Sequence, residues 1–280
     1  MAHPRPSSFR SVSLLLALAA SAAFAKPQVY GESAMVKVRP NTPPHADAGV
    51  ALVAARNELI SFQVVVHGGD TGLAGVRAQL PGLSGPSTLS GPSTLSGPNV
   101  TLYREEFLDV RTPTFPTSET GRWPDALVPD VDEISGEQRG AFPFHVPPGE
   151  SRAVWVDVLV PMATPPGAYA GEVHVSGEAF DARVPVTLEV VPVTLPSTPS
   201  LASAFLLWMP NVCQAHTGSP NCGGTAQTAA LVERYQRMAL EHRITLSNPL
   251  THAGNWSAFD AQHGPYLDGT APTRLPGARM

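Results

Sequence analysis

The chain has 280 residues, of which 42% are hydrophobic and only 15% are charged. That hydrophobic content supports a folded core, while the scarcity of charge argues against coiled coils and charged tails. The 18 basic residues are scattered along the chain, and the formal net charge is −5. Because proteins that bind nucleic acid concentrate Lys and Arg on one surface, this pattern predicts no nucleic-acid partner.

The first 25 residues have the layout of a secretory signal. Basic residues, among them Arg10, precede an apolar run from Val12 to Ala20, and Ala23-Phe24-Ala25 follows as a small-x-small cleavage site. The run is about half as long as a membrane-spanning helix, which needs about 20 apolar residues. We therefore expect cleavage after Ala25 and a mature protein that is secreted or periplasmic and not held in a membrane.

Residues 26–198 are expected to form an antiparallel β domain. Short stretches that alternate between apolar and polar residues, broken by turn residues, fill most of this range. The expected strands are Ala34–Val38, Val50–Ala54, Leu59–His67, Val100–Val110, Val154–Val160, Tyr169–Val175 and Ala182–Val193. Two sheets can bury their valine-rich faces against each other, with Val154 to Val160 as an example of such a face. The sequence therefore predicts a β-sandwich.

Two stretches of this domain are expected to be loops. Leu83 to Pro98 repeats Ser-Gly-Pro-Ser-Thr-Leu, and Thr112 to Gly140 is long and polar. The adjacent carboxylates Asp132 and Glu133 lie in the second stretch and are interpreted as solvent-exposed. Pro185 predicts that the last strand lies at a sheet edge or at a bulge.

Residues 199–280 have a different pattern after a proline-rich linker. The apolar run Leu201–Met209 predicts a strand buried on both faces, and Thr225–Ile244 has the apolar stripe of a helix. Ile244–Ser247 is a candidate for a second strand, and no helical repeat is evident after Pro249. Strand, helix and strand open an α/β fold such as a (β/α)8 barrel, which takes about 250 residues. We expect residues 199–280 to be the truncated start of such a barrel.

The two cysteines, Cys213 and Cys222, lie close together in a stretch rich in turn residues. In an exported protein they are expected to form a local disulfide. The alternative is a zinc site that also uses His216, but a fourth ligand and the usual paired spacing are missing. The disulfide is the preferred interpretation, and no metal or other cofactor is predicted.

Two segments of the chain resemble the glycoside hydrolase family 123 group and its relatives. One is Ala55-Arg56-Asn57-Glu58 followed by Ser61-Phe62-Gln63-Val64-Val65-Val66. The other is Val154-Trp155-Val156-Asp157-Val158 with Pro166-Gly167-Ala168-Tyr169-Ala170-Gly171. The resemblance implies a β-sandwich that precedes a (β/α)8 catalytic barrel, and these motifs themselves are interpreted as architectural.

The resemblance also implies a chemistry. Such enzymes are similar to N-acetylhexosaminidases in which the substrate's own acetamido group is the nucleophile and an Asp/Glu pair assists. That pair lies on later barrel strands, so no residue of this chain is assigned a catalytic role. Trp208 and Asn248 are the candidate sugar-binding residues, because Trp208 lies at the carboxyl end of the first expected barrel strand and Asn248 follows the second. The chain is thus interpreted as the non-catalytic, amino-terminal portion of a secreted glycosidase that acts on N-acetylhexosamine-containing glycans. The alternative interpretation is a secreted β-sandwich module that binds carbohydrate or protein and has no catalytic activity.

Overall fold

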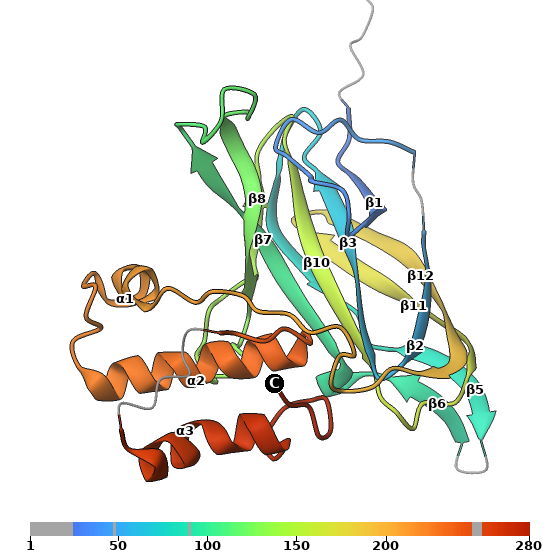
Figure 1. Cartoon of the computed structure of the whole chain (residues 1–280). Coiled ribbons are helices and arrows are strands. Elements are labelled where there is room, and N and C mark those ends of the chain that lie inside the picture. Colours follow the sequence, from blue (N-terminus) through green and yellow to red (C-terminus); the bar gives the residue numbers. More distant parts are fainter. Residues whose placement is uncertain (1–24, 47–48, 89–90, 248–253) are drawn as a thin grey trace, which may run out of the picture.

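The computed structural model describes residues 25–46, 49–88, 91–247 and 254–280, and it is shown in Figure 1. Apart from Ala25, the predicted secretory signal lies outside these residues. The chain is mainly β: twelve strands precede three α-helices in the described part. None of the helices described is long and apolar enough to cross a membrane.

The element bounds are as follows. The strands are β1 (Gln28–Ser33), β2 (Val50–Arg56), β3 (Glu58–His67), β4 (Leu73–Gln79), β5 (Leu83–Thr88), β6 (Gly91–Leu95), β7 (Val100–Val110), β8 (Gly121–Pro129), β9 (Phe144–Val146), β10 (Ser151–Val160), β11 (Gly167–Gly177) and β12 (Phe180–Thr194). The helices are the short 3-10 helix η1 (Gly97–Asn99), α1 (Met209–Thr217), α2 (Thr225–Glu241) and α3 (Trp256–Asp268).

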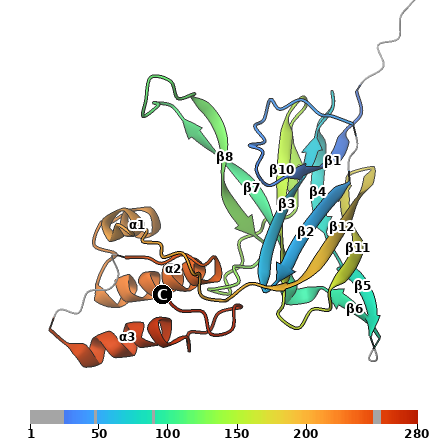
Figure 2. The same ribbon diagram turned by 45° about the vertical axis from the view of Figure 1, so that its right-hand side comes forward.

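The strands form two curled sheets, which Figure 2 shows from the side. The first has the order β1-β3-β10-β7-β8 and is antiparallel throughout. The second has the order β2-β12-β11-β4-β9, with the hairpin of β5 and β6 attached to β11, and β12 pairs with β2 in parallel. One core lies between them: Val154, Val156, Val158 and Val160 of β10 are fully buried in it, as predicted from their alternation.

Ala34–Val38 is not a strand, contrary to the prediction. The backbone turns there and continues as an irregular segment. The side chain of Gln63 donates to the carbonyl oxygens of Ser33 and Val36, both at 2.8 Å. Because these acceptors are taken by a side chain, a strand is not needed to satisfy them.

The repeat segment Leu83–Pro98 was expected to be a loop, and the structure corrects this. Its two copies pair with each other as β5 and β6, with Leu83 opposite Leu95. Both leucines are buried in the core, so the repeat supplies apolar anchors to the fold. The second expected loop is also partly a strand, since β8 pairs with β7 over Gly121–Pro129.

Pro185 lies in an interior strand, contrary to the prediction of an edge or a bulge. β12 has β11 on one side and β2 on the other. Pairing with β2, however, begins only at Val186, which lies opposite Val50. The missing N–H of Pro185 therefore costs no hydrogen bond to β2.

Leu201–Met209 is not a strand buried on both faces. One parallel bridge joins Phe205 to Leu246, with Phe205 N donating to Thr245 O and Ser247 N donating to Phe205 O. Phe205 and Leu206 are 56% and 70% exposed, whereas Leu207 packs into a small cluster beside α2. A strand buried on both faces needs elements packed above and below it, and the exposure of Phe205 and Leu206 shows that the described part of the chain does not cover this segment in that way.

The helical region contains one predicted helix and one unexpected helix. The helix expected over Thr225–Ile244 is confirmed as α2, and Ile244–Ser247 contributes only the bridge at Leu246. The prediction that no helix follows Pro249 was wrong, because α3 has capping signals at both ends. Asn255 caps its first turn by accepting from Ala258 N, and Gly269 ends it with φ +86°.

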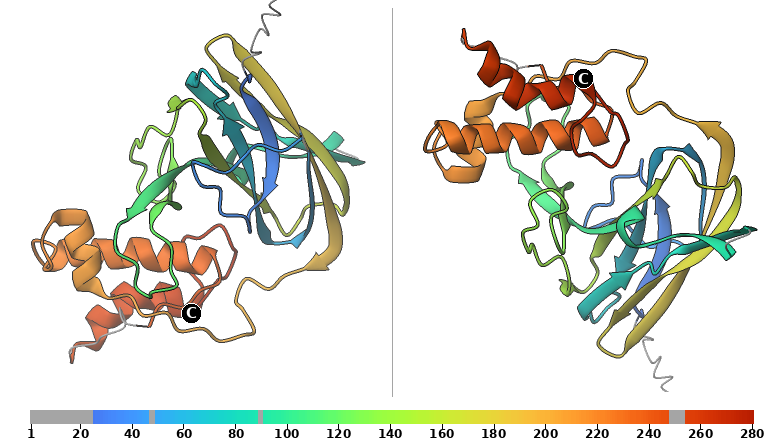
Figure 3. Two further views of the ribbon diagram at one scale, coloured as in Figure 1. Left: turned by 90° about the horizontal axis from the view of Figure 1, so that it is seen from above. Right: turned by 90° about the horizontal axis from the view of Figure 1, so that it is seen from below.

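Figure 3 shows the three helices grouped on one side of the sheets, connected to β12 by the linker. The buried Asn57, at φ 61°, holds this linker by donating to Leu195 O and Ser197 Oγ. Arg243 at the end of the α2 segment donates to Asn57 O and to Pro196 O. The Ala55-Arg56-Asn57-Glu58 motif thus has an architectural role, and the Glu58 carboxylate accepts from Ala55 N.

Candidate functional site

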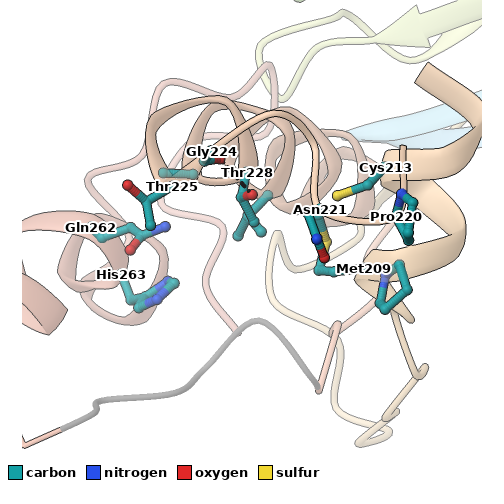
Figure 4. Close-up of a pocket in the computed structure, with 12 residues that line it drawn as sticks. Met209, Cys213, Pro220, Asn221, Gly224, Thr225, Thr228, Gln262 and His263 are labelled. Carbon is teal, nitrogen blue, oxygen red and sulfur yellow. Dashed lines mark hydrogen bonds between the residues drawn. The ribbon is translucent and has the colours of Figure 1, made fainter. Parts of the chain in front are cut away.

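A pocket of about 580 Å³ opens between α1, α2 and α3. Its walls come from α1, from the turn that leads into α2, and from the middle of α3. In the view of Figure 4, Gln262 and His263 lie on one side, Asn221 and Cys213 lie on the other, and Thr228 lies between them. The lining residues are Met209, Pro210, Cys213, Pro220, Asn221, Gly224, Thr225, Thr228, Ala229, Val232, Gln262 and His263.

His263 is the titratable side chain of this pocket. It is 1% exposed, and burial lowers its pKa, so the imidazole is neutral at pH 7. Its Nδ1 lies 3.3 Å from Nε2 of Gln236, which is itself fully buried. With the carboxamide nitrogen donating to Nδ1, the ring carries its proton on Nε2 and can donate a hydrogen bond to a ligand.

The pocket wall next to α1 is fixed by a disulfide. Cys213 and Cys222 are joined, with their Cα atoms 4.5 Å apart. The predicted pairing is confirmed, and the zinc interpretation is wrong because both thiolates are consumed. His216 instead lies with Nε2 3.1 Å from the hydroxyl of Tyr235.

The start of α2 adds backbone donors to the pocket. Gly224 is the N-cap residue, and no side chain caps the helix there. Thr228 directs its hydroxyl to Gly224 O at 2.9 Å, so its oxygen still has lone pairs to accept a hydrogen bond. Uncapped amides at a helix N-terminus favour ligand oxygens.

Of the two residues predicted from the sequence to bind sugar, Trp208 lies within the described part of the chain. Trp208 directly precedes α1, its side chain is 55% exposed, and it is not one of the pocket-lining residues. Its role stays a prediction. Asn248 lies outside the described residues.

The pocket can bind a polar ligand, but it lacks an acid–base pair. Amide, hydroxyl and imidazole groups line it, and none of its lining residues in the described chain is Asp or Glu. Glycoside hydrolysis ordinarily requires carboxyl groups beside the scissile bond.

Sequence reasoning missed His263, Gln262 and Gln236. The available signal was the pattern of α3, in which Phe259 and His263 are four residues apart and their rings lie 5.0 Å apart. Gln236 had no signal of its own, because a buried glutamine on a helix is recognisable only from its partner on another helix.

Two pairs of adjacent carboxylates, Glu105-Glu106 and Asp132-Glu133, lie on β7 and in the loop after β8, respectively. Glu105 is 5% exposed, and burial raises its pKa to about 7, opposed by Lys37. Glu106 forms an ion pair with Arg104. Asp132 and Glu133 belong to the loop after β8 and are held by Arg139 and Arg274, respectively.

No known protein family matches the sequence, and no curated protein matches it. A similar solved structure is a family 123 glycoside hydrolase from Clostridium perfringens that hydrolyses glycolipid glycans, with a TM-score of 0.59 and 11% identity. The match covers 78% of this chain and 36% of that one, so this chain spans little more than a third of the enzyme it resembles. At this identity the likeness concerns the fold alone.

Two further solved structures match with low scores. A PapD-like domain of human CEP192 has a TM-score of 0.29 and 12% identity over 66% of this chain and 98% of that one. The CooA pilin subunit from enterotoxigenic Escherichia coli has a TM-score of 0.26 and 12% identity over 59% and 99%. Scores of this size carry no argument about this protein.

Proposed function

We propose that this chain is the amino-terminal, non-catalytic portion of a secreted or periplasmic glycoside hydrolase that acts on N-acetylhexosamine-containing glycans. Residues 26–198 would be its β-sandwich, and residues 199–280 would be the start of its (β/α)8 barrel. The observation that carries this proposal is the structural match to the family 123 enzyme. Residues 1–198 are 198 of the 280 residues, which is less than 78% of the chain. Because the match covers 78%, it includes part of residues 199–280.

Two further observations support the barrel assignment. The bridge between Phe205 and Leu246 is parallel, and the helices α1 and α2 lie between these two residues in the chain. A strand, a helical crossover and a parallel strand are the unit from which a (β/α)8 barrel is built. The disulfide in the crossover fits an oxidising compartment, in agreement with the proposed export.

In this proposal the pocket beside α1 and the exposed ring of Trp208 bind a sugar. Barrel enzymes bind substrate beyond the carboxyl ends of their strands, and Trp208 and Met209 directly follow the strand-like segment at Phe205. An exposed indole offers a flat apolar face to a pyranose ring, while Asn221 and Gln262 offer hydrogen bonds to hydroxyl groups. Asn248 follows the second strand-like segment and is proposed as a further contact.

The test is a binding and a hydrolysis experiment on the full chain. Titration with N,N′,N″-triacetylchitotriose, followed by Trp fluorescence, is expected to show saturable binding that Trp208→Ala weakens about tenfold. Trp123→Ala is the matched control, since Trp123 packs under Arg39, 4.2 Å from ring centroid to Cζ, on the β8 strand. Release of nitrophenol from 4-nitrophenyl N-acetylhexosaminides by the purified chain would contradict the non-catalytic role.

A secreted binding module without any catalytic counterpart is the second candidate. In that case the sheets would hold the ligand, and sugar binding would survive Trp208→Ala unchanged. The same titration therefore separates the two candidates.

A further inference from the structure

A second cleft, of about 330 Å³, lies between the outer face of the five-stranded sheet and the carboxyl end of α2. Its walls come from side chains of β3, β7, β8 and β10, from the loop after β8, and from Met238 and His242. It shares no lining residue with the pocket between the helices. Its size is within the range of small-molecule sites, which is about 300–1,000 Å³.

Asp157 of β10 forms the polar floor of this cleft. The residue is 5% exposed, and its Oδ1 accepts hydrogen bonds from Ser61 Oγ at 2.6 Å and from Trp155 Nε1 at 2.7 Å. Within the described residues, Oδ2 accepts no hydrogen bond and no Lys, Arg or His forms an ion pair with Asp157. Oδ2 is not one of the solvent-inaccessible polar atoms of the described residues, so it can accept a partner from the cleft, and a positive group would complement its charge.

The other carboxylates of the cleft already have partners. Glu133 accepts from the Tyr103 hydroxyl at 3.0 Å and forms an ion pair with Arg274, also at 3.0 Å. Asp132 accepts from the backbone N–H of Ser135 at 2.8 Å and faces Arg139 at 3.7 Å. The negative charge available to a ligand is therefore that of Asp157.

Aromatic side chains surround this charge. Trp155 and Tyr103 are cross-strand neighbours on β10 and β7, and both line the cleft. Burial raises the pKa of Tyr103, and the charges of Glu133 and Asp157 raise it further, so the phenol is neutral and its ring keeps a negative face. Among the cleft-lining residues described, the one basic side chain is that of His242, and it forms no ion pair with Asp157.

We propose that this cleft binds a small organic cation, with its ammonium group at Asp157 Oδ2 and its apolar substituents against Trp155 and Tyr103. Aromatic rings attract cations through their faces, and the attraction is larger where water is excluded, as it is at the nearly buried Asp157. A neutral ligand of the same shape would gain the apolar contacts alone. The site is independent of the sugar-binding role proposed for the helical pocket.

The test uses choline and its neutral isostere 3,3-dimethylbutan-1-ol with the full chain. In NMR spectra of the four indole N–H groups, choline is expected to shift the Trp155 signal and to leave that of Trp208 unchanged. The isostere should bind about tenfold more weakly. Trp155→Phe identifies the Trp155 signal by its loss.

Asp157→Asn tests the charge itself, since it keeps the shape of the side chain. It is expected to weaken choline binding about tenfold and to leave the binding of the isostere unchanged. Glu172→Gln, which removes a carboxylate paired with Arg183 on the other sheet, is the control for net charge. Near-UV circular dichroism shows whether each variant is folded. If Asp157→Asn does not fold, the comparison of choline with its isostere on the wild-type chain still tests the proposal.

Three outcomes would overturn the proposal: equal affinity of the two probes, a choline-induced shift of the Trp208 or Trp256 signal in place of Trp155, or no shift of any indole signal. Binding of methyl glucoside that competes with the isostere but not with choline would also overturn it, because the aromatic walls would then serve a sugar.

Discussion

The sheets and the helical region of this protein bury their side chains in different ways. Both sheets share one continuous core, to which β2, β3, β4 and β10 to β12 all contribute buried residues. The helical region has no such core in the described residues. Its buried apolar side chains fall into small clusters: three are centred on Leu207, Leu231 and Leu240, and a fourth joins Leu275 and Ala278 to a strand.

The small clusters mean that the helical region depends on other links. The disulfide ties α1 to the start of α2, and Arg274 joins Glu241 of α2 to Glu133 of the loop after β8. Leu275 and Ala278 pack on Leu159 of β10. Hydrophobic burial thus accounts for the sheets, whereas a covalent bond and contacts with the sheets hold the helices.

The largest expected effect is on the core of the sheets. Phe62 is fully buried in it, and Phe62→Ala is expected to lower the free energy of unfolding by about 3–5 kcal/mol. Both regions should lose structure, because the helices rest on the sheets.

Leu231→Ala is the counterpart in the helical region and should remove hydrogen-exchange protection from α2 while the strands keep theirs. Loss of strand protection in Leu231→Ala would contradict the division into two regions.

A pH dependence of similar size is expected on the outer face of the five-stranded sheet. Burial raises the pKa of Glu105 to about 7, so the folded state binds this proton more tightly than the unfolded state does. This tighter binding of the proton stabilises the folded state fully below the unfolded pKa of about 4.5. The stabilisation is lost as the pH rises through 7, which lowers the free energy of unfolding by about 3 kcal/mol in total.

Glu105→Gln is therefore expected to be about 3 kcal/mol more stable than the wild type at pH 8 and equally stable at pH 4, measured by urea unfolding. Glu106→Gln, in an ion pair with Arg104, is the control that should keep the wild-type slope. An unchanged slope in Glu105→Gln would show that another group titrates.

The disulfide should matter to the helices alone. Replacing both cysteines by serine frees a loop of nine residues and is expected to destabilise α1 and the start of α2 by about 2.5 kcal/mol. Hydrogen exchange resolved by segment is the measurement: α2 amides should exchange faster, and β10 amides should not change. Faster exchange in β10 would mean that the two regions unfold together.

The smallest expected effect is at the linker. Asn57→Gly keeps the positive φ without strain but removes the hydrogen bonds to Leu195 O and Ser197 Oγ, at a cost of about 1–2 kcal/mol. The variant should loosen the helices relative to the sheets, seen as faster exchange at Ser197. Ala179→Gly, at another positive φ, removes no such bond and is the matched control. Equal exchange at Ser197 in both variants would show that the hydrogen bonds of Asn57 do not hold the linker.

Local patterns predicted those elements whose burial repeats along the chain. The valines of β10 alternate, and α2 has an apolar stripe, so each could be recognised without knowledge of its neighbours. The hairpin of β5 and β6 escaped recognition because its two buried leucines, Leu83 and Leu95, are twelve residues apart in the chain and form no alternating pattern. The prediction of a doubly buried strand over Leu201–Met209 was wrong in the opposite sense, because apolar composition does not specify whether other elements cover both faces of a segment.

The sequence by itself determined a mainly β chain, a helix over α2 and the pairing of its only two cysteines, because periodicity and proximity in the chain are local properties. Only the tertiary structure decided where the polar side chains meet. Ser61, Tyr103 and Asp157 come from three strands that are distant in the sequence, and His263 meets Gln236 across two helices. Strand register and helix packing set these encounters, and neither is encoded in any single segment.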